Sequence, residues 1–149
     1  MGESGWVKGS CLCGEVQFRI EFPTKWCAHC HCELCRRAHS AAFVTWVGVP
    51  QEQFEITQGS EHLRSYASSA DARRSFCERC GTQLLFESAR WAGEIHVARA
   101  ALEGELDRDP AAHAYYDRHP SWMGMRDDLP KLGGESGTEP LPSADRASD

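Results

Sequence analysis

The sequence lacks any long apolar run, and no stretch approaches the roughly 20 residues that a membrane-spanning helix needs. Its first six residues contain no basic segment followed by an apolar one, so we expect no secretory signal. A basic surplus is also missing, because the formal net charge is −6 with neutral histidines. Such a surface repels phosphate backbones. We therefore expect a cytoplasmic protein that binds neither membranes nor nucleic acids.

Cysteine, by contrast, is plentiful, with eight residues in a chain of 149. The eight fall into three tight clusters: Cys11 and Cys13; Cys27, Cys30, Cys32 and Cys35; Cys77 and Cys80. Without an export signal, we expect a reducing compartment, where metal binding explains such clusters better than disulfides do. The alternative is a small secreted domain with four disulfides, and it is disfavoured because C-x-C pairs bridge poorly.

Strand patterns recur at short intervals along the chain. Residues 15–22 alternate strictly, with Val16, Phe18, Ile20 and Phe22 on one side, which predicts a half-buried strand. We expect further strands in residues 6–8, 42–49, 54–57, 63–66, 74–76, 83–86 and 94–98, and a short helix in residues 33–38. Short strands separated by Gly, Pro and Ser predict a mainly β fold of small antiparallel sheets.

The composition changes near residue 133. Residues 134–149 are rich in Gly, Ser, Pro and acidic residues, and they lack the apolar side chains that would offset the entropy of ordering. We therefore expect one zinc-binding domain over residues 1–133 and a disordered acidic tail over residues 134–149.

The two outer clusters each offer half of a tetrahedral metal site. Cys11 and Cys13 precede Cys77 and Cys80 by roughly 60 residues, and a glycine follows each pair. A zinc ion held by four cysteines is coordinatively closed, so its role is structural. The alternative is two unrelated pairs of buried thiols. We predict a four-cysteine zinc site that joins the N-terminal strands to the middle of the chain.

The middle cluster offers an open site. Cys30, Cys32 and Cys35 form a C-x-C-x-x-C arc that can hold three corners of a tetrahedron and leave the fourth to water or substrate, as catalytic zinc sites do. Cys27 is an alternative fourth ligand that would close the site, or a redox partner of Cys30. His29 and His31 are further possible ligands, although the alternation of residues directs His31 away from the neighbouring sulfurs.

Five segments occur in a combination that resembles the glutathione-dependent formaldehyde-activating enzyme family, also called the centromere-protein-V-like family. They are KGSCLCGEV at residues 8–16, CHCELCRR at 30–37, AAF at 41–43, RSFCERCGT at 74–82 and DDLP at 127–130. Cys27 departs from the usual pattern of the family.

The resemblance implies a β-tent fold with two zinc ions per chain, one structural and one catalytic. By position, the structural ligands are Cys11, Cys13, Cys77 and Cys80, and the catalytic ligands are Cys30, Cys32 and Cys35. The implied reaction adds glutathione to formaldehyde and gives S-hydroxymethylglutathione, which is a carbon–sulfur lyase reaction in reverse. Arg36 and Arg37 follow the catalytic ligands and are candidates to bind the two carboxylates of glutathione.

Two classes of function remain in competition. The first is a zinc enzyme that joins a thiol such as glutathione to formaldehyde or a related small carbonyl compound. The second is a non-catalytic module that binds glutathione or a protein and carries two closed structural sites. A redox or metal-sensing role for Cys27 and Cys30 is a third option. The fourth ligand of the second site discriminates between the first two.

Overall fold

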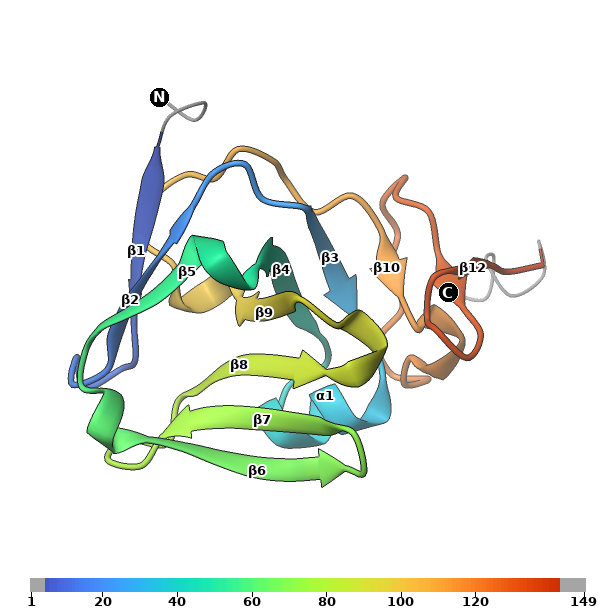
Figure 1. The fold of residues 1–149 in the computed structure, drawn as a ribbon. Helices are drawn as coiled ribbons and strands as arrows, with labels where there is room; N and C mark the ends of the chain where they lie inside the picture. The colour runs from blue at the N-terminus through green and yellow to red at the C-terminus, as the bar shows by residue number, and fades with distance from the viewer. Residues whose placement is uncertain (1–4, 143–149) are drawn as a thin grey trace. The chain divides into compact units, whose positions relative to one another are not determined.

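The computed structural model describes residues 5–142 (Figure 1). Contacts between residues divide them into two compact units, one of residues 5–26 and 47–109 and one of residues 27–46 and 110–142. Strands dominate both units, which confirms the mainly β class. No helix within residues 5–142 has the length and apolar character needed to cross a membrane.

The elements run as follows. The strands are β1 (Trp6–Ser10), β2 (Gln17–Glu21), β3 (Trp26–Cys30), β4 (Val44–Pro50), β5 (Phe54–Gln58), β6 (Leu63–Ser69), β7 (Ala72–Cys77), β8 (Gln83–Ser88), β9 (Glu94–Ala98), β10 (His113–Ala114), β11 (Leu132–Gly133) and β12 (Glu139–Pro140). The α-helix is α1 (Glu33–His39), and single 3-10 turns are η2 (Gln51–Gln53), η3 (Ser60–His62), η4 (Ala89–Trp91), η5 (Arg99–Ala101) and η6 (Tyr116–Arg118).

The first unit contains a small antiparallel sheet in the order β1-β2-β5. Phe18 and Ile20 of β2 are fully buried, as the alternating pattern predicts, and the Phe18 ring lies 5.5 Å from that of Phe54 on β5. Burial of each such side chain stabilises the fold by about 1.5–3 kcal/mol. Trp6 and Arg19, on the other face, are partly exposed, and the Arg19 guanidinium lies over the Trp6 ring.

Strands β4, β9, β8, β7 and β6 follow one another in the second sheet of this unit. The β6–β7 and β7–β8 pairs are antiparallel, as expected for small antiparallel sheets, and Figure 1 shows these strands side by side. The turn η3 connects β5 to β6, so the chain passes there from one sheet to the other.

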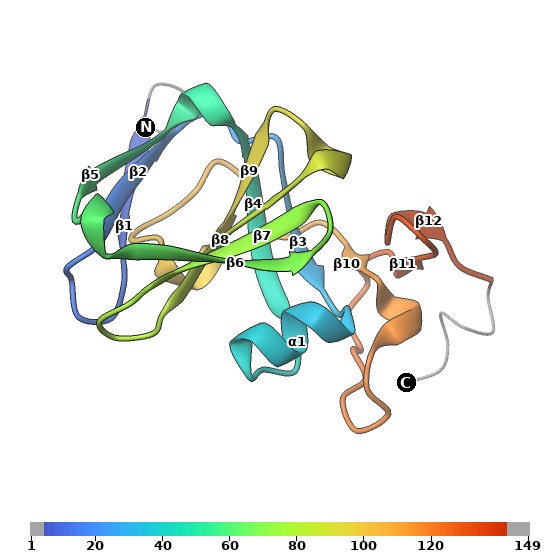
Figure 2. The ribbon, with the colours of Figure 1, turned by 60° about the horizontal axis from the view of Figure 1, so that its bottom comes forward.

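The second unit is built on β10, β3 and β4, in that order. Strands β10 and β3 are parallel, with Ala114 opposite Cys30. The helix α1 follows β3 after two residues and begins at Cys32, whose sulfur accepts a hydrogen bond from the backbone N–H of Cys35. Figure 2 shows this strand–helix connection. The predicted helix after the second cysteine cluster is therefore confirmed.

Two segments differ from the sequence-based expectations. No strand was predicted at the start of the second cluster, but Cys27 and Cys30 lie within β3, where pairing with residues 111–114 holds the backbone extended. Residues 134–142 form a turn and β12, which pairs with β11, and Leu141 is buried. Ordered chain therefore extends beyond the boundary that composition predicts at residue 133. The rest of the predicted tail, residues 143–149, lies outside the described residues.

Gly59, between β5 and η3, is a position where only glycine suits the backbone. Its φ is +78°, and a Cβ there would lie 1.9 Å from the carbonyl oxygen of Glu15. We expect Gly59→Ala to destabilise the fold by more than the roughly 1–2 kcal/mol that the left-handed conformation alone imposes. Gly93→Ala is the matched control, because Gly93 has a φ of +86° and no atom within 4 Å of its Cβ position. Urea unfolding of both variants measures the difference, and equal losses would contradict the close approach to Glu15.

Candidate metal centres

Two similar turns bring four cysteines together in the first unit. Cys11 and Cys13 lie in the β1–β2 connection, where the N–H of Gly14 donates to the carbonyl of Cys11. Cys77 ends β7 and Cys80 lies in the β7–β8 connection, where the N–H of Gly81 donates to the carbonyl of Cys77. Both glycines have a positive φ, of 81° and 83°, which closes each turn without steric conflict. The two turns match as the sequence predicts, and Figures 1 and 2 show them at the same end of the unit.

The four sulfurs have the spacing of a tetrahedral metal site. They all lie within 4.8 Å of one another. Cys13 Sγ is 3.6 Å from Cys11 Sγ and 3.9 Å from Cys77 Sγ, although Cys13 and Cys77 are 64 residues apart. Four sulfurs at about 2.3 Å from a central zinc would be separated by about 3.8 Å. The four side chains therefore fit a zinc ion.

The thiols of Cys80 and Cys13 have different pKa values. Desolvation raises the pKa of Cys80, but hydrogen bonds from the hydroxyl and backbone N–H of Thr82 outweigh this effect and lower the pKa to about 5. The pKa of Cys13 rises to about 11: a hydrogen bond from the backbone of Glu15 favours its thiolate, but desolvation and the sulfurs of Cys11, Cys80 and Cys77 outweigh it. Close sulfurs cannot all become thiolates unless a cation lies between them. A divalent metal would supply that charge.

Backbone N–H groups already point at these sulfurs. The N–H of Val16 donates to Cys11 Sγ at 3.3 Å, and that of Cys13 donates to Cys80 Sγ at 3.4 Å. Such donors orient metal ligands and spread their negative charge. The turns thus provide both the ligands and the groups that stabilise them as thiolates.

The second unit brings together Cys30, Cys32 and Cys35, the three residues predicted as catalytic ligands. Their sulfurs lie within 4.8 Å of one another, and Cys30 Sγ is 3.5 Å from Cys35 Sγ. Cys30 and Cys35 are buried, whereas Cys32 is partly exposed. Hydrogen bonds with the sulfurs of Cys32 and Cys35, together with burial, raise the pKa of Cys30 well above its ordinary value. Three converging sulfurs again fit a soft divalent metal.

Cys27 does not belong to this group of sulfurs, within the residues that the structure describes. It is 2% exposed, on the same strand as Cys30. Side chains alternate between the two faces of a strand, so residues three apart point to opposite sides. The strand conformation therefore directs the side chains of Cys27 and Cys30 to opposite faces. An irregular loop would not fix their relative directions.

His29 and His31 are likewise not grouped with the three sulfurs. The ring of His29 stacks on that of His113 at 5.1 Å, and its Nδ1 lies 2.7 Å from the hydroxyl of Thr45. His31 is fully buried, and its Nε2 lies 2.9 Å from Nδ1 of His113. Both rings are thus directed toward other partners.

His113 also contacts Asp127, the first residue of the DDLP segment. Its Nε2 lies 3.0 Å from both carboxylate oxygens of Asp127, and an ionised carboxylate can only accept, so Nε2 carries the proton. Desolvation raises the pKa of Asp127, but the hydrogen bond from His113 outweighs this effect and lowers the pKa. Burial, with smaller contributions from neighbouring positive groups, lowers the pKa of His31 to about 3, so its ring is neutral near pH 7. A hydrogen-bonded chain from the exposed Asp127 through the buried His113 to the buried His31 therefore fixes the residue between Cys30 and Cys32.

The sequence-based interpretation left His113 unassigned and gave Asp127 no role beyond the family motif. The contact between His31 and His113 depends on the parallel pairing of β10 with β3, because the two histidines are 82 positions apart. The buried pairing of His31 with His113 has no local sequence signal.

Arg36 and Arg37, the predicted glutathione-binding residues, have different surroundings. Arg36 donates to the carbonyls of His31 and Arg118, at 3.1 and 3.0 Å. Arg37 is exposed on α1, and its Nε lies 3.1 Å from a carboxylate oxygen of Glu33. The first guanidinium secures the start of the helix, and the second faces solvent.

Comparison with known proteins places these clusters in a family. The sequence profile of the glutathione-dependent formaldehyde-activating enzyme family matches residues 6–118. The chain belongs to this family. The matched region contains all eight cysteines and His113.

Three known proteins are similar to this chain. A Halomonas elongata protein provisionally named a glutathione-dependent formaldehyde-activating enzyme is 27% identical over 124 residues, which covers 78% of this chain and 79% of that protein. An uncharacterized lyase of Schizosaccharomyces pombe is 38% identical over 86 residues, covering 53% of this chain and 56% of that one. A crystal structure of a Rhodobacter sphaeroides protein, 28% identical, aligns with a TM-score of 0.58 over 68% of this chain and 93% of its own.

Removing one ligand from each cluster should separate their roles. We expect Cys77→Ser to lose one zinc ion and to lower the unfolding temperature strongly, because closed zinc sites provide about 10–16 kcal/mol of apparent binding energy to the fold. We expect Cys32→Ser to lose the other zinc ion with a smaller effect on unfolding. Zinc analysis and thermal denaturation measure both effects. Wild-type stability and zinc content in Cys77→Ser would contradict the four-cysteine site.

The strand position of Cys27 leads to a separate prediction. Cys27→Ala should retain two zinc ions per chain, because its sulfur lies outside the three-sulfur group. A modest loss of stability is expected from the smaller side chain at this buried position. Zinc content of the purified, fully loaded variant tests this. A drop to about one zinc would identify Cys27 as a ligand and the second site as closed.

Proposed function

We propose that the protein is a zinc-dependent enzyme of the carbon–sulfur lyase type that adds a thiol such as glutathione to formaldehyde or a related small carbonyl compound, or catalyses the reverse. The observation that carries the proposal is the three-sulfur group of Cys30, Cys32 and Cys35, from which Cys27 is excluded. Membership of the formaldehyde-activating family supports the substrate class.

Three sulfurs leave one tetrahedral position available. A zinc ion bound there would supply Lewis acidity and would favour the thiolate form of a thiol that occupies the open position. In the addition, the thiol sulfur forms a bond to the carbonyl carbon, the carbon–oxygen double bond becomes a single bond, and the thiol proton ends on the new hydroxyl. No oxidant or reductant is needed.

The chain's own residues would hold this site rigid. Cys32 serves at once as a proposed ligand and as the N-cap of α1, so the helix fixes its sulfur. Arg36 ties α1 to the backbone of His31 and Arg118. Rigid support of this kind keeps reacting groups aligned.

Arg37 is the better placed of the two candidate arginines for a glutathione carboxylate. Its side chain is 78% exposed, and its pair with Glu33 is a surface ion pair of the kind worth about 0–1 kcal/mol. A carboxylate of the substrate can therefore replace Glu33 at little cost. Arg36 would not bind the substrate directly. It would support the site by holding the backbone carbonyls of His31 and Arg118 in place.

The competing function is a non-catalytic glutathione- or protein-binding module with two closed structural sites. That function requires a fourth protein ligand at the second site. The alternation of side chains along β3 directs Cys27 away from Cys30, and this favours the open site and the enzyme. The β-tent fold, the cytoplasmic location and the second zinc ion belong to the same proposal.

The proposed reaction can be followed directly by NMR. Purified zinc-loaded protein is mixed with glutathione and formaldehyde, and formation of the hydroxymethyl adduct is compared with the uncatalysed rate. We expect wild type and Cys27→Ala to accelerate it, and Cys32→Ser to lose at least about 100-fold, because it lacks a ligand of the open site. No acceleration by wild type, or equal acceleration by Cys32→Ser, would refute the proposal.

A further inference from the structure

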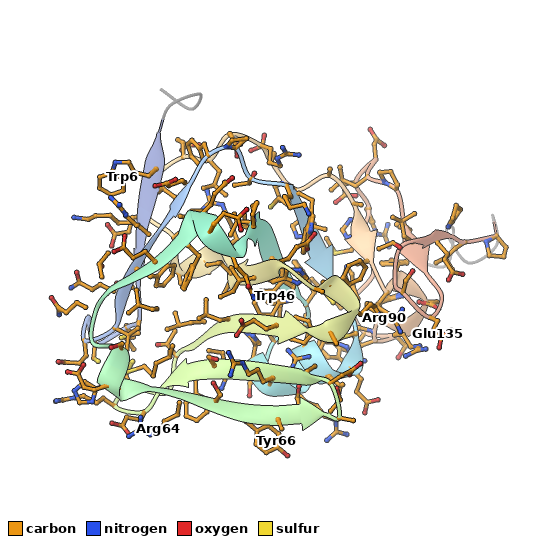
Figure 3. The ribbon with its side chains drawn as sticks, viewed as in Figure 1. Trp6, Trp46, Arg64, Tyr66, Arg90 and Glu135 are labelled. Carbon is orange, nitrogen blue, oxygen red and sulfur yellow. The ribbon has the colours of Figure 1, made fainter. Side chains whose placement is uncertain are left out.

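Trp46 lies beside the three-cysteine group in the second unit. It belongs to β4, it is 4% exposed, and its indole Nε1–H donates to Cys35 Sγ at 3.4 Å. His39, at the end of α1, packs edge-on against the ring at 5.3 Å and 85°. Trp46 is labelled in Figure 3. The contacts with Cys35 and His39 of α1 therefore hold the indole in one orientation.

The hydrogen bond is chemically specific. An indole N–H can only donate, and a buried one needs an acceptor. A neutral thiol is a weak acceptor, whereas a metal-bound thiolate carries negative charge and accepts strongly. The arrangement thus suits Cys35 best when its sulfur ligates a metal.

The sulfurs of this group receive donors of different kinds. Cys32 Sγ accepts from the backbone N–H of Cys35 at 3.3 Å, as part of the helix cap. Cys35 Sγ, on α1, accepts from a side chain on strand β4. Hydrogen bonds to ligand sulfurs withdraw charge from them and tune the metal. Trp46 therefore makes the charge on the three sulfurs unequal.

We propose that Trp46 is a positioning residue of the three-cysteine site, whose indole N–H fixes the direction of Cys35 Sγ and withdraws charge from that sulfur when it ligates the metal. The inference rests on the proposed metal site. A site that handles a small aldehyde must keep its own ligand sulfurs from reacting with that electrophile. The indole N–H lowers the nucleophilicity of Cys35 and so protects a ligand that must stay on the metal.

Trp46→Phe removes the donor and keeps an aromatic ring. Trp26→Phe is the matched control, because the Trp26 indole donates to a carboxylate oxygen of Glu94 at 3.3 Å and to no sulfur. With cobalt(II) in place of zinc, we expect the sulfur-to-cobalt charge-transfer band to move to longer wavelength in Trp46→Phe only. Zinc affinity at this site should fall about 10-fold. Iodoacetamide should alkylate Cys35 faster, as peptide mass spectrometry would show.

A direct measurement covers the case in which Trp46→Phe fails to fold. In wild-type protein loaded with cadmium-113 and labelled with nitrogen-15, the indole Hε1 should show scalar coupling to the metal through the hydrogen bond to sulfur. Replacement of Trp46 by the benzothienyl analogue, which has sulfur in place of the N–H, should abolish that coupling.

The outcomes separate this inference from the proposed reaction, because none of these measurements requires turnover. Metal bound by the three cysteines without indole coupling, with an unshifted cobalt band in Trp46→Phe, would overturn the role of Trp46 alone. Failure of the three cysteines to bind any metal would overturn both. Coupling and a band shift without catalysis would support Trp46 and refute the enzyme.

Discussion

Repulsion between close cysteine sulfurs is the constraint on which the rest of the structure depends. The first unit places four sulfurs within 4.8 Å of one another and closes two distant turns around them. Against desolvation, hydrogen bonds from Thr82 lower the pKa of Cys80 to about 5. Against a hydrogen bond from Glu15, desolvation and the neighbouring sulfurs raise the pKa of Cys13 to about 11, as expected for sulfurs that cannot all ionise together. A divalent cation removes that conflict. A metal bound there would therefore stabilise the contact between the β1–β2 and β7–β8 turns.

The second unit also places cysteine sulfurs within 4.8 Å of one another, but it has three of them where the first unit has four. Cys30 ends a strand, Cys32 caps a helix and Cys35 lies one turn into that helix. This change from strand to helix within five residues turns three sulfurs to one point. The chain from Asp127 through His113 to His31 supports the same turn from the side opposite to the sulfurs. One face of this short segment thus presents the three sulfurs, and the other packs against His113.

Much of this was accessible from sequence because the signals are local. The alternation in residues 15–22 predicted β2 and its buried face, and the glycines after Cys13 and Cys80 predicted matching turns. What was missed depends on partners far along the chain. Strand β3 forms because residues 111–114 pair with it, and no pattern in residues 26–30 signals that pairing. The bond between His113 and His31 was missed for the same reason. The bond from Trp46 to Cys35 spans only 11 positions, but it joins a strand to a helix and has no periodic signal.

The geometry of β3 also explains how an additional cysteine can occur without closing the site. A three-residue separation would place two sulfurs together on a helix but places them on opposite faces of a strand. Cys27 and Cys30 are both buried, yet the strand directs them to different surroundings. The pairing of β10 with β3 therefore influences chemistry as well as folding, because it keeps this backbone extended. Any change that weakened the pairing would give Cys27 the freedom to approach the other three sulfurs, and the proposed open metal site would then become a closed one.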